Sequence, residues 1–446
     1  DADAWTLGFV ASEELQDGRG ARVALKRTYY DGEPFVGLGL GKVTQGLVRR
    51  VSVWTEGDTL LDQERYDHDT HGNVTVALGA TGGRTELTYD PTGTFVVTER
   101  RQSGEDSWLQ WKATWDSRFG AITSLQQPTG SQITLSYDAL GRIERVVQPG
   151  DTEELPTTRY EYRLGSPLSQ VVTHSRVLSG QEDELLGVTQ VDGLGRKRGV
   201  FAEGAKTGTW LLSGLNAYDA RGQLAHEAYA TEESSSDLPS DALDRDGTTT
   251  LRDALGRELV TRHSDQSESR KAYGPLTVTL WDENDADPES PHADTPTTRH
   301  FDGLQRLVQV QERDGQRTLT TGAYTYDAAG KLLTLTDAAG SVRRYQYDGL
   351  GRRTRIEDPN AGTWKLAYDA AGNPTRREDP TGRVVTHDYD LLSRPLHRHL
   401  QLPSGEPVLA VTWHYDEPSK DHAELGNTAG QLAWVQDEAG AVYYGY

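Results

Sequence analysis

The sequence predicts an all-β chain, a long antiparallel meander of hairpins that coils into a spiral shell. Three observations predict this fold: a Tyr-Asp turn signature that recurs along the chain, strands of period-two alternation between the turns, and a hydrophobic content of only 35%. Open sheets rarely exceed about 10 strands without curling or splitting. Because sheet twist has a fixed hand, a meander of a few tens of strands must coil.

The repeat is the strongest signal in the sequence, and internal repeats define array architectures. From Asp327 to Asp390 the aspartates recur every 21 residues, and a weaker aspartate follows three of them after ten residues, so the unit is about half of 21. The Tyr-Asp pairs stand at Tyr66-Asp67, Tyr89-Asp90, Tyr137-Asp138, Tyr218-Asp219, Tyr326-Asp327, Tyr347-Asp348, Tyr368-Asp369, Tyr389-Asp390 and Tyr415-Asp416, with degenerate versions at Trp115-Asp116, Val191-Asp192, Arg252-Asp253 and Phe301-Asp302.

The residues of the turns indicate the type of turn that they form. In "DAAG" (Asp327 to Gly330) the Asp stands at position i and the Gly at i+3, the preferred pattern of a type I turn. The carboxylate can accept the N–H two residues on, and the Gly can take the positive φ of a hairpin bulge. "DGLG" at Asp348 and "DPTG" at Asp379 follow the same rule.

The segments between turns alternate as half-buried strands do. "GTWKLAY" puts Trp364, Leu366 and Tyr368 on one face. "SQITLSY" and "AVTWHY" do the same with Ile133, Leu135 and Tyr137 and with Val411, Trp413 and Tyr415. Because the apolar faces are thin, we expect a single wall with one semi-apolar face and not a sandwich with a filled core.

The chain divides into a segment that leads into the repeats, residues 1–65, and a repeat shell, residues 66–446. Gaps of 54 and 49 residues follow Asp138 and Asp253, and acidic loop insertions are expected near 231–247 and 282–299. The sequence contains no Met and ends where another Tyr-Asp unit is due, so we expect a piece of a longer polypeptide.

These motifs resemble a known family. Y-D-x-x-G-[RKN] at about 21-residue intervals resembles the RHS/YD repeat over most of 66–446. "YYDGEPFVGLGLGKV" (Tyr29 to Val43) with "RYDHDTHGNV" (Arg65 to Val74) resembles the start of the array in the TcB component (TcB/TcC-type) of bacterial insecticidal toxin complexes.

The resemblance implies a fold and a role. Arrays of this family coil into a cocoon that encloses a cytotoxic C-terminal domain until delivery, and an aspartyl autoprotease at the end of the repeats cuts the cargo free. Its motif would lie beyond residue 446; the similar "DPNAG" and "DPTG" at Asp358 and Asp379 fall in phase with the repeat and are interpreted as turns. No catalytic residue of the family can be carried onto this chain.

Composition excludes several classes of partner. Asp and Glu number 68 and Lys and Arg 46, a formal charge of −22, which argues against nucleic acid and anionic lipid surfaces. No stretch approaches the roughly 20 apolar residues of a membrane-spanning helix. Cysteine is absent, which excludes disulfides, thiolate metal sites and a thiol nucleophile.

The candidate sites favour structural interpretations, so we predict no catalytic, cofactor-binding or metal-binding residue. Asp67, Asp69 and Gly72 have offsets reminiscent of a calcium loop, but the twelfth position is Leu78; the loop from Asp244 fails in the same way at Leu255. His397 and His399 lack a third zinc ligand nearby. The Tyr/Trp stripe could bind sugar or an unfolded chain, but cross-strand packing explains it without a ligand.

Two functions remain open, with an enzyme built from distant strands having no positive support. The first is a secreted, non-enzymatic containment shell whose expected partners are the rest of its RHS shell, the enclosed toxin domain and other toxin-complex subunits. The alternative is an extracellular adhesion or carbohydrate-binding module, for which Trp364 would be a test position.

Overall fold

The computed structural model describes residues 8–165, 168–206, 208–239, 244–315 and 317–446. Residues 1–7 of the predicted leading segment and residues 240–243 of the first predicted insertion lie outside this range. Within the described residues the chain forms 36 strands, one α-helical turn and one 3-10 helix, and the strands build two sheets of 17 and 19 members. The prediction of an all-β antiparallel meander is confirmed.

The chain divides into two units, one of Asp1–Ser131 with Tyr324–Tyr446 (unit 1) and one of Gln132–Ala323 (unit 2). Unit 1 contains β1 (Ser12–Gln16), β2 (Arg22–Tyr30), β3 (Val48–Glu56), β4 (Thr59–His68), β5 (Val74–Gly79), β6 (Arg84–Tyr89), β7 (Val96–Gln102), β8 (Trp108–Asp116), β9 (Ala121–Gln126), β27 (Leu332–Asp337), β28 (Val342–Tyr347), β29 (Arg353–Asp358), β30 (Gly362–Tyr368), β31 (Pro374–Glu378), β32 (Val384–Tyr389), β33 (Pro395–Gln401), β34 (Val408–Tyr415), η1 (Lys420–Leu425), β35 (Leu432–Asp437) and β36 (Gly440–Tyr443). Unit 2 contains β10 (Gln132–Tyr137), β11 (Ile143–Val147), β12 (Thr158–Arg163), β13 (Leu168–Arg176), β14 (Glu184–Asp192), β15 (Lys197–Glu203), β16 (Trp210–Ser213), β17 (Leu215–Tyr218), β18 (Leu224–Ala228), β19 (Thr231–Glu233), β20 (Gly247–Arg252), β21 (Glu258–Arg262), β22 (Glu268–Tyr273), β23 (Thr277–Trp281), α1 (Glu283–Ala286), β24 (Thr297–Phe301) and β25 (Leu307–Asp314), and β26 (Arg317–Tyr326) ends in unit 1.

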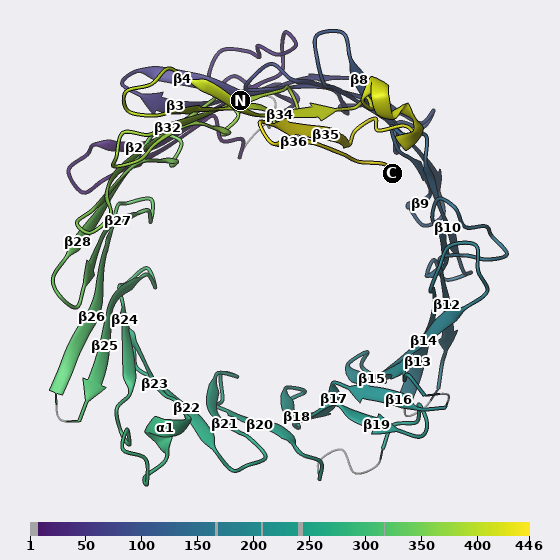
Figure 1. Ribbon diagram of the computed structural model, residues 1–446, viewed down its shortest axis with the longest axis vertical. Helices are drawn as coiled ribbons and strands as arrows, with labels where there is room; N and C mark the ends of the chain where they lie inside the picture. The colour runs from purple at the N-terminus through teal and green to yellow at the C-terminus, as the bar shows by residue number, and fades with distance from the viewer. Residues whose placement is uncertain (1–7, 166–167, 207, 240–243, 316) are drawn as a thin grey trace. The chain divides into compact units, whose positions relative to one another are not determined.

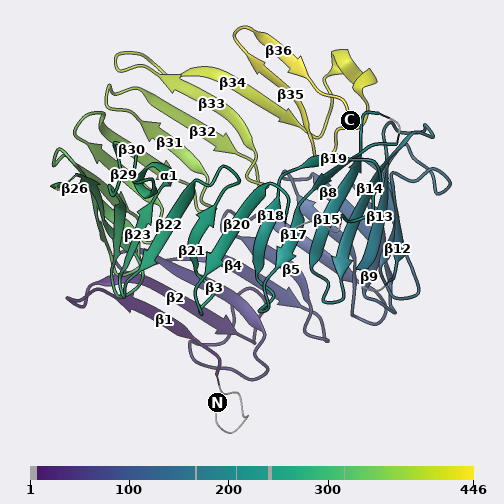
Figure 2. The same ribbon diagram turned by 90° about the horizontal axis from the view of Figure 1, so that it is seen from below.

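Most strands pair with their neighbours in chain order, as Figures 1 and 2 show for the run from β27 to β36. The order changes where β16 pairs with β19 and β18 pairs with β20. Opposite residues of an antiparallel pair lie on the same face. In β30 the register places Trp364 opposite Ile356 and Leu366 opposite Arg377. Trp364, Leu366 and Tyr368 are half-buried and the residues between them are exposed, as the predicted alternation requires. The meander therefore follows the period-two pattern of the sequence.

The meander continues through the two gaps in the repeat. Strands β11 to β14 lie in the first gap and β21 to β24 in the second. The predicted insertions also contain regular structure: β19 pairs with β16, and α1 is capped at its N-terminus by Asp282, whose side chain accepts the N–H of Asp285. None of the helices in the described part of the chain reaches the length and apolarity that crossing a bilayer requires.

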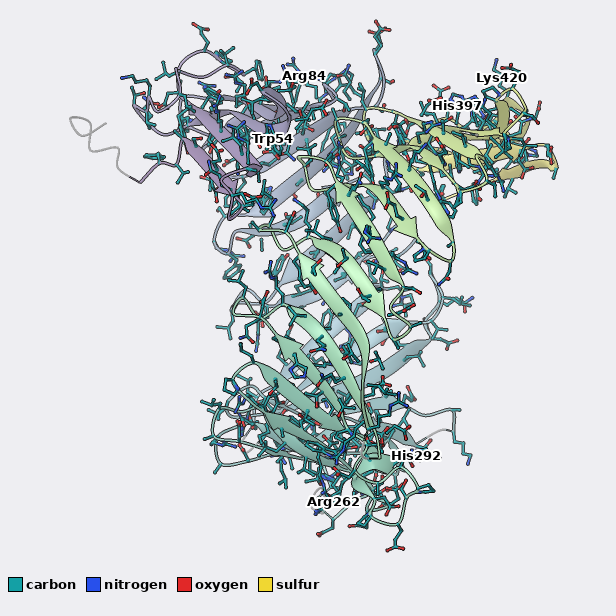
Figure 3. The ribbon with its side chains drawn as sticks, turned by 90° about the vertical axis from the view of Figure 1, so that its left-hand side faces the viewer. Trp54, Arg84, Arg262, His292, His397 and Lys420 are labelled. Atoms are coloured by element: carbon teal, nitrogen blue, oxygen red, sulfur yellow. The ribbon has the colours of Figure 1, made fainter. Side chains whose placement is uncertain are left out.

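Side chains cover both faces of the strands (Figure 3), and few are fully buried. The accessible surface is 26247 Å², whereas a compact protein of 49.2 kDa exposes about 17,000 Å². The buried cluster in unit 2 consists of Val172, Val188, Phe201, Leu212, Leu215 and Ala228. The chain therefore gains much of its stability from strand pairing and cross-strand contacts.

Each sheet has two rims of turns. The YD rim carries the turns that begin at an aspartate of the repeat, such as Asp348 and Asp390, and the turns at the other strand ends form the opposite rim. In unit 1 the YD rim of β28 to β35 packs against the opposite rim of β3 to β9. The Gly349 N–H donates to Thr55 O at 3.0 Å, and Asn427 Nδ2 donates to Thr129 O at 2.8 Å across 298 residues of sequence. A β-carbon on Gly83 would lie 2.7 Å from Leu391 O.

Candidate functional site

The repeat turn has the structure that its sequence predicts. In the turn from Asp348 to Arg352, Asp348 Oδ1 accepts the N–H groups of Leu350 at 3.0 Å and Arg352 at 2.9 Å. The Gly351 N–H donates to Asp348 O at 2.9 Å, and Gly351 has φ +80°. The aspartate therefore caps a type I turn, and the glycine supplies the left-handed residue that follows it.

The arginine after the glycine has a role that the sequence interpretation missed. Arg352 Nε donates to Asp348 Oδ2 at 2.7 Å, and Nη1 donates to Asp369 O at 2.6 Å. Its guanidinium also lies over the ring of Tyr368, 4.9 Å from the centroid, which is within the range of a cation–π contact. One side chain thus connects its own turn to the tyrosine and the aspartate of the next repeat.

The tyrosines connect the repeats in the reverse direction. The Tyr368 hydroxyl donates to Arg353 O at 2.9 Å, and Arg353 is the first residue of the strand after the preceding YD turn. The same bond recurs from Tyr89 to Val74, Tyr162 to Ile143, Tyr218 to Lys197, Tyr347 to Leu332 and Tyr389 to Pro374. In the degenerate pair Trp115-Asp116 the indole N–H replaces the hydroxyl and donates to Val96 O at 2.8 Å.

The contacts of the repeat continue through the first gap and part of the second, although no Tyr-Asp pair marks them there. Tyr162 is followed by Arg163, so no Tyr-Asp pair marks it, yet it carries the hydroxyl bond and lies 4.1 Å from the Arg142 guanidinium. Tyr273 lies 4.4 Å from the Arg257 guanidinium in the second gap. A search for Tyr about 20 residues after an Asp-x-x-Gly-Arg turn would have found both.

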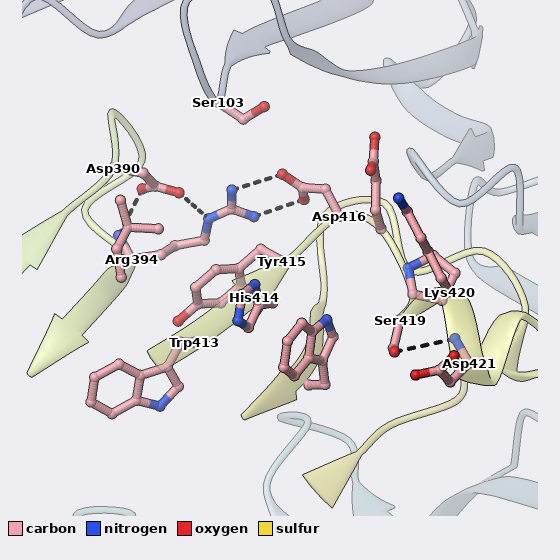
Figure 4. Close-up of a pocket in the computed structure, with 14 residues that line it drawn as sticks. Ser103, Asp390, Arg394, Trp413, His414, Tyr415, Asp416, Ser419, Lys420 and Asp421 are labelled. Atoms are coloured by element: carbon pink, nitrogen blue, oxygen red, sulfur yellow. Dashed lines mark hydrogen bonds and ion pairs between the residues drawn. The ribbon is translucent and has the colours of Figure 1, made fainter. Parts of the chain in front are cut away.

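The last complete turn contains the most buried arginine of the repeat turns (Figure 4). Arg394 Nε donates to Asp390 Oδ2 at 2.6 Å, and its two terminal nitrogens donate to the two oxygens of Asp416 at 2.8 Å each. Asp416 has φ +72° and its Oδ1 also accepts the Gly430 N–H at 2.9 Å. The bidentate pair therefore fixes both ends of the segment 416–430, which contains η1.

A pocket of about 660 Å³ lies beside this pair. Trp413, His414, Tyr415 and Trp434 contribute rings, and Ser103 approaches from the β7–β8 turn of unit 1. His414 and Trp434 stack with centroids 3.4 Å apart, and burial lowers the pKa of His414, with a smaller contribution from His397. Arg394 is committed to two aspartates and the two rings cover each other, so the charged side chains left to line the pocket come from the segment after Asp416, at Glu417, Lys420 and Asp421.

A second pocket, of about 390 Å³, contains the tryptophan that sequence reasoning named as a possible sugar platform. The Arg377 guanidinium lies 4.3 Å from the Trp364 ring centroid, and Arg353 lies 4.5 Å from that of Tyr345. Both contacts come from neighbouring strands, so they are cross-strand packing. A sugar stacking on the same ring face would have to displace Arg377.

The calcium-like loop consists of a salt bridge and a turn. Arg49 Nη1 donates to Asp67 Oδ1 at 2.7 Å, and Asp69 Oδ1 accepts the N–H groups of His71 and Asn73. Leu78 lies in β5, opposite Arg65. Across the described ranges, no group of three or more His, Asp or Glu residues has metal-binding geometry. The rings of His397 and His399 lie 6.2 Å apart, and His397 is 3.5 Å from Asp388 Oδ2.

The segment before the repeats contains a buried carboxylate that sequence reasoning did not single out. Asp31 is 5% exposed and has φ +51°. Its carboxylate accepts four consecutive backbone N–H groups, of Thr44, Gln45, Gly46 and Leu47, at 2.6 to 3.2 Å. Burial raises the pKa of Asp31, but these four bonds outweigh it and lower the pKa to about 2.

Comparisons with known proteins agree with this geometry. A family model described as RHS Repeat matches residues 301–342, 326–363 and 368–406. The sequence has no significant match among curated proteins.

Several solved structures share the fold. A TcdB2–TccC3–Cdc42 structure has a TM-score of 0.80 and 17% identity, and covers 94% of this chain and 28% of its own. A TcdB2–TccC3 structure has a TM-score of 0.79 and 18% identity, and the match covers 94% of this chain and 26% of that one. A Tc holotoxin pore of Photorhabdus luminescens with a TccC3 mutant has a TM-score of 0.81 and 16% identity, and the match covers 94% of this chain and 28% of that one. The likeness is one of fold, and this chain spans about a quarter of the length of those chains.

Proposed function

This chain carries RHS repeats and has the fold of the TcdB2–TccC3 toxin-complex structures, and from that premise we propose that it is a segment of a shell that encloses a cytotoxic C-terminal cargo and shields it before delivery. The observation that carries the proposal is the fold match over 94% of the chain. The large surface relative to mass supports it, because a wall has two wet faces where a solid domain has a core.

In this role the chain is a wall and not a catalyst. The repeating Asp, Gly, Arg and Tyr bind one another, as in the turn from Asp348 to Arg352 and its link to Tyr368. The partners in this proposal are the rest of the RHS shell, the enclosed toxin domain and other toxin-complex subunits. The location is extracellular, since the neighbour in fold is part of a holotoxin.

Small-angle X-ray scattering of the chain in solution tests the wall. A solid domain of 446 residues has a radius of gyration of about 22 Å. We expect a clearly larger radius of gyration after extrapolation to zero protein concentration. The distribution of interatomic distances is expected to shift toward long distances. A radius of about 22 Å would show a solid domain and overturn the shell.

The alternative is a carbohydrate-binding module, and the pocket beside Trp364 is the observation that favours it. A glycan array distinguishes the two functions. Specific binding that is lost in Trp364→Ala but kept in Trp54→Ala would support the alternative, and no specific binding by the folded chain would favour the shell.

A further inference from the structure

The pocket of about 390 Å³ in unit 1 is lined by two exposed arginines that share one unusual feature. The Arg377 guanidinium lies over the ring of Trp364, 4.3 Å from its centroid. The Arg353 guanidinium lies over the ring of Tyr345 in the same way, at 4.5 Å. In the part of the chain that the structure describes, neither guanidinium has a carboxylate partner, so two positive charges line the pocket without a counter-charge.

Arginines stacked on rings elsewhere in the described ranges are paired with a carboxylate. The nitrogen–oxygen distances run from 2.6 to 3.6 Å, from Arg22 with Glu14 near the start of the chain to Arg394 with Asp390 near its end. Carboxylates are in excess in this sequence, with 68 Asp and Glu against 46 Lys and Arg. The missing partners of Arg353 and Arg377 are therefore specific to this pocket.

Asp358 also lines the pocket, but its carboxylate is already bound. Its Oδ2 accepts Arg343 Nε at 2.6 Å. Its Oδ1 accepts the N–H groups of Asn360 at 2.8 Å and Ala361 at 3.1 Å. The pair of Asp358 and Arg343 is neutral, so the two stacked arginines supply the net charge of the described lining.

Apolar side chains form the floor of the pocket between the two cations. Tyr345 lies opposite Ile356 on β29, and Ile356 lies opposite Trp364 on β30. The two rings are therefore two strand spacings apart, about 10 Å, with Ile356 between them. Leu366 lies opposite Arg377 and is half-buried. The pocket thus combines an apolar floor with a cation on either side.

The stacking leaves the binding edge of each guanidinium open. A guanidinium has five N–H donors in a planar fork, and they lie along its edge and not on the face that meets the ring. A carboxylate can bind Arg377 while the arginine stays on Trp364, whereas an uncharged sugar would have to displace it. The ring also holds the guanidinium in place beforehand, which lowers the entropy cost of binding.

We propose that this pocket binds a small organic anion, a carboxylate carried on an aromatic or aliphatic body. The carboxylate pairs with Arg353 or Arg377 in a charge-assisted contact, and the body lies on Ile356 and Leu366. Ligand pockets of about 300–1,000 Å³ are lined in this way, by apolar and aromatic side chains with a few placed polar groups. The inference goes beyond the proposed shell and does not depend on it.

Isothermal titration calorimetry of the whole chain with cinnamate and with cinnamamide tests the proposal. The two probes have the same body and nearly the same size, and they differ in charge. We expect saturable binding of cinnamate and binding of cinnamamide that is at least about tenfold weaker. Equal affinities would show a purely apolar site, and a lack of cinnamate binding up to its solubility limit would show no site. Either result would overturn the proposal.

Two double variants locate the binding. Arg353→Gln with Arg377→Gln is expected to weaken cinnamate binding at least about tenfold and to leave cinnamamide binding unchanged. The control, Arg344→Gln with Arg376→Gln, removes the same charge from exposed positions beside Tyr345 and Arg377, on the other face of the sheet. It is expected to bind cinnamate as the wild type does. Binding that survives in the first variant, or is lost in the control, would refute the site, and circular dichroism confirms that each variant is folded.

Discussion

At the scale of single residues, Asp31 shows how a carboxylate can organise a loop without a metal. Four consecutive N–H groups from Thr44 to Leu47 point at one carboxylate. Such an arrangement of backbone donors favours an anion, and here the anion belongs to the chain itself. The loop from residue 31 to 47 is closed by it.

Asp31 makes the free energy of unfolding depend on pH in the acid range. Its pKa is lowered from 3.8 to about 2, so its contribution is complete above about pH 4 and is lost as the pH falls through 2. The shift corresponds to about 2 kcal/mol. We expect Asp31→Asn to lower the free energy of unfolding by about that amount at pH 7, and the difference from the wild type to shrink toward pH 2. Denaturant unfolding at several pH values measures it, and a difference that does not change with pH would contradict the assignment.

The turn glycines make a second prediction. Gly351 has φ +80°, which costs a residue with a β-carbon about 1–2 kcal/mol. Gly351→Val is therefore expected to lower the thermal midpoint, and Gly330→Val, at φ +82°, to do the same. Gly193→Val is the control, because it lies in a turn of the same kind without positive φ and with open space around it. Equal midpoints for Gly351→Val and the wild type would refute the turn assignment.

The local sequence predicts most of the turn. Asp and Gly are identifiable because their roles lie within five residues. The partners of Arg352 and Tyr368 are not, because Tyr368 donates to a carbonyl 15 residues back and any residue supplies a carbonyl. A side chain that binds backbone leaves no complementary residue to recognise in the sequence.

At the scale of elements, an arginine or lysine and a tyrosine connect one hairpin to the next in turns such as those from Asp138, Asp327 and Asp348, and an asparagine makes the link after Gly72 and Gly372. The strands predicted beside turns that begin with a Tyr-Asp pair, such as β10, β30 and β34, are present in the structure. The prediction weakened between 138 and 192 and between 253 and 302, where strands continue without Tyr-Asp pairs. Strand pairing needs only alternation and backbone groups, so the structure tolerates the loss of a signature that sequence analysis depends on.

Arg394 provides the test at this scale. Arg394→Lys keeps the charge but cannot bind Asp390 and Asp416 together in the fork geometry of a guanidinium. We expect faster amide hydrogen exchange in residues 416–430, with the other strands of unit 1 unchanged. Arg398→Lys, an exposed position on β33, is the control and should leave exchange as it is. Unaltered exchange in Arg394→Lys would show that the segment is held by other contacts.

At the scale of the whole molecule, the sequence predicts coiling but not the register of the rims. Gly349 meets Thr55, and Asn427 meets Thr129, because of how many strands intervene and how each is twisted. The accumulated twist depends on every hairpin between the two contact points, including the hairpins without a Tyr-Asp signature. Local patterns therefore predict that the meander coils, and they leave open which turns meet.

Gly349 gives the corresponding prediction. A β-carbon there would lie 2.1 Å from Thr55 O, although the φ of Gly349 is ordinary. Gly349→Ala must therefore separate the two rims, and we expect a lower thermal midpoint and faster exchange of the Thr55 region. Gly303→Ala occupies the same position in the turn from Asp302, has nothing within 4 Å, and should behave as the wild type. If both variants match the wild type, the rims are not in contact in solution.

The tyrosine bond also sets an order of assembly. In the six tyrosines described above, from Tyr89 to Tyr389, the hydroxyl donates to the first residue of a strand that lies 15 to 21 residues earlier in the chain. A repeat can therefore be completed as soon as its tyrosine leaves the ribosome, with no need for residues still to be translated. Because these contacts are local, the hairpins avoid the loop-closure cost that slows most all-β proteins. The hairpins can fold one after another during synthesis. Only the contact between rims has to wait for residues almost 300 positions away.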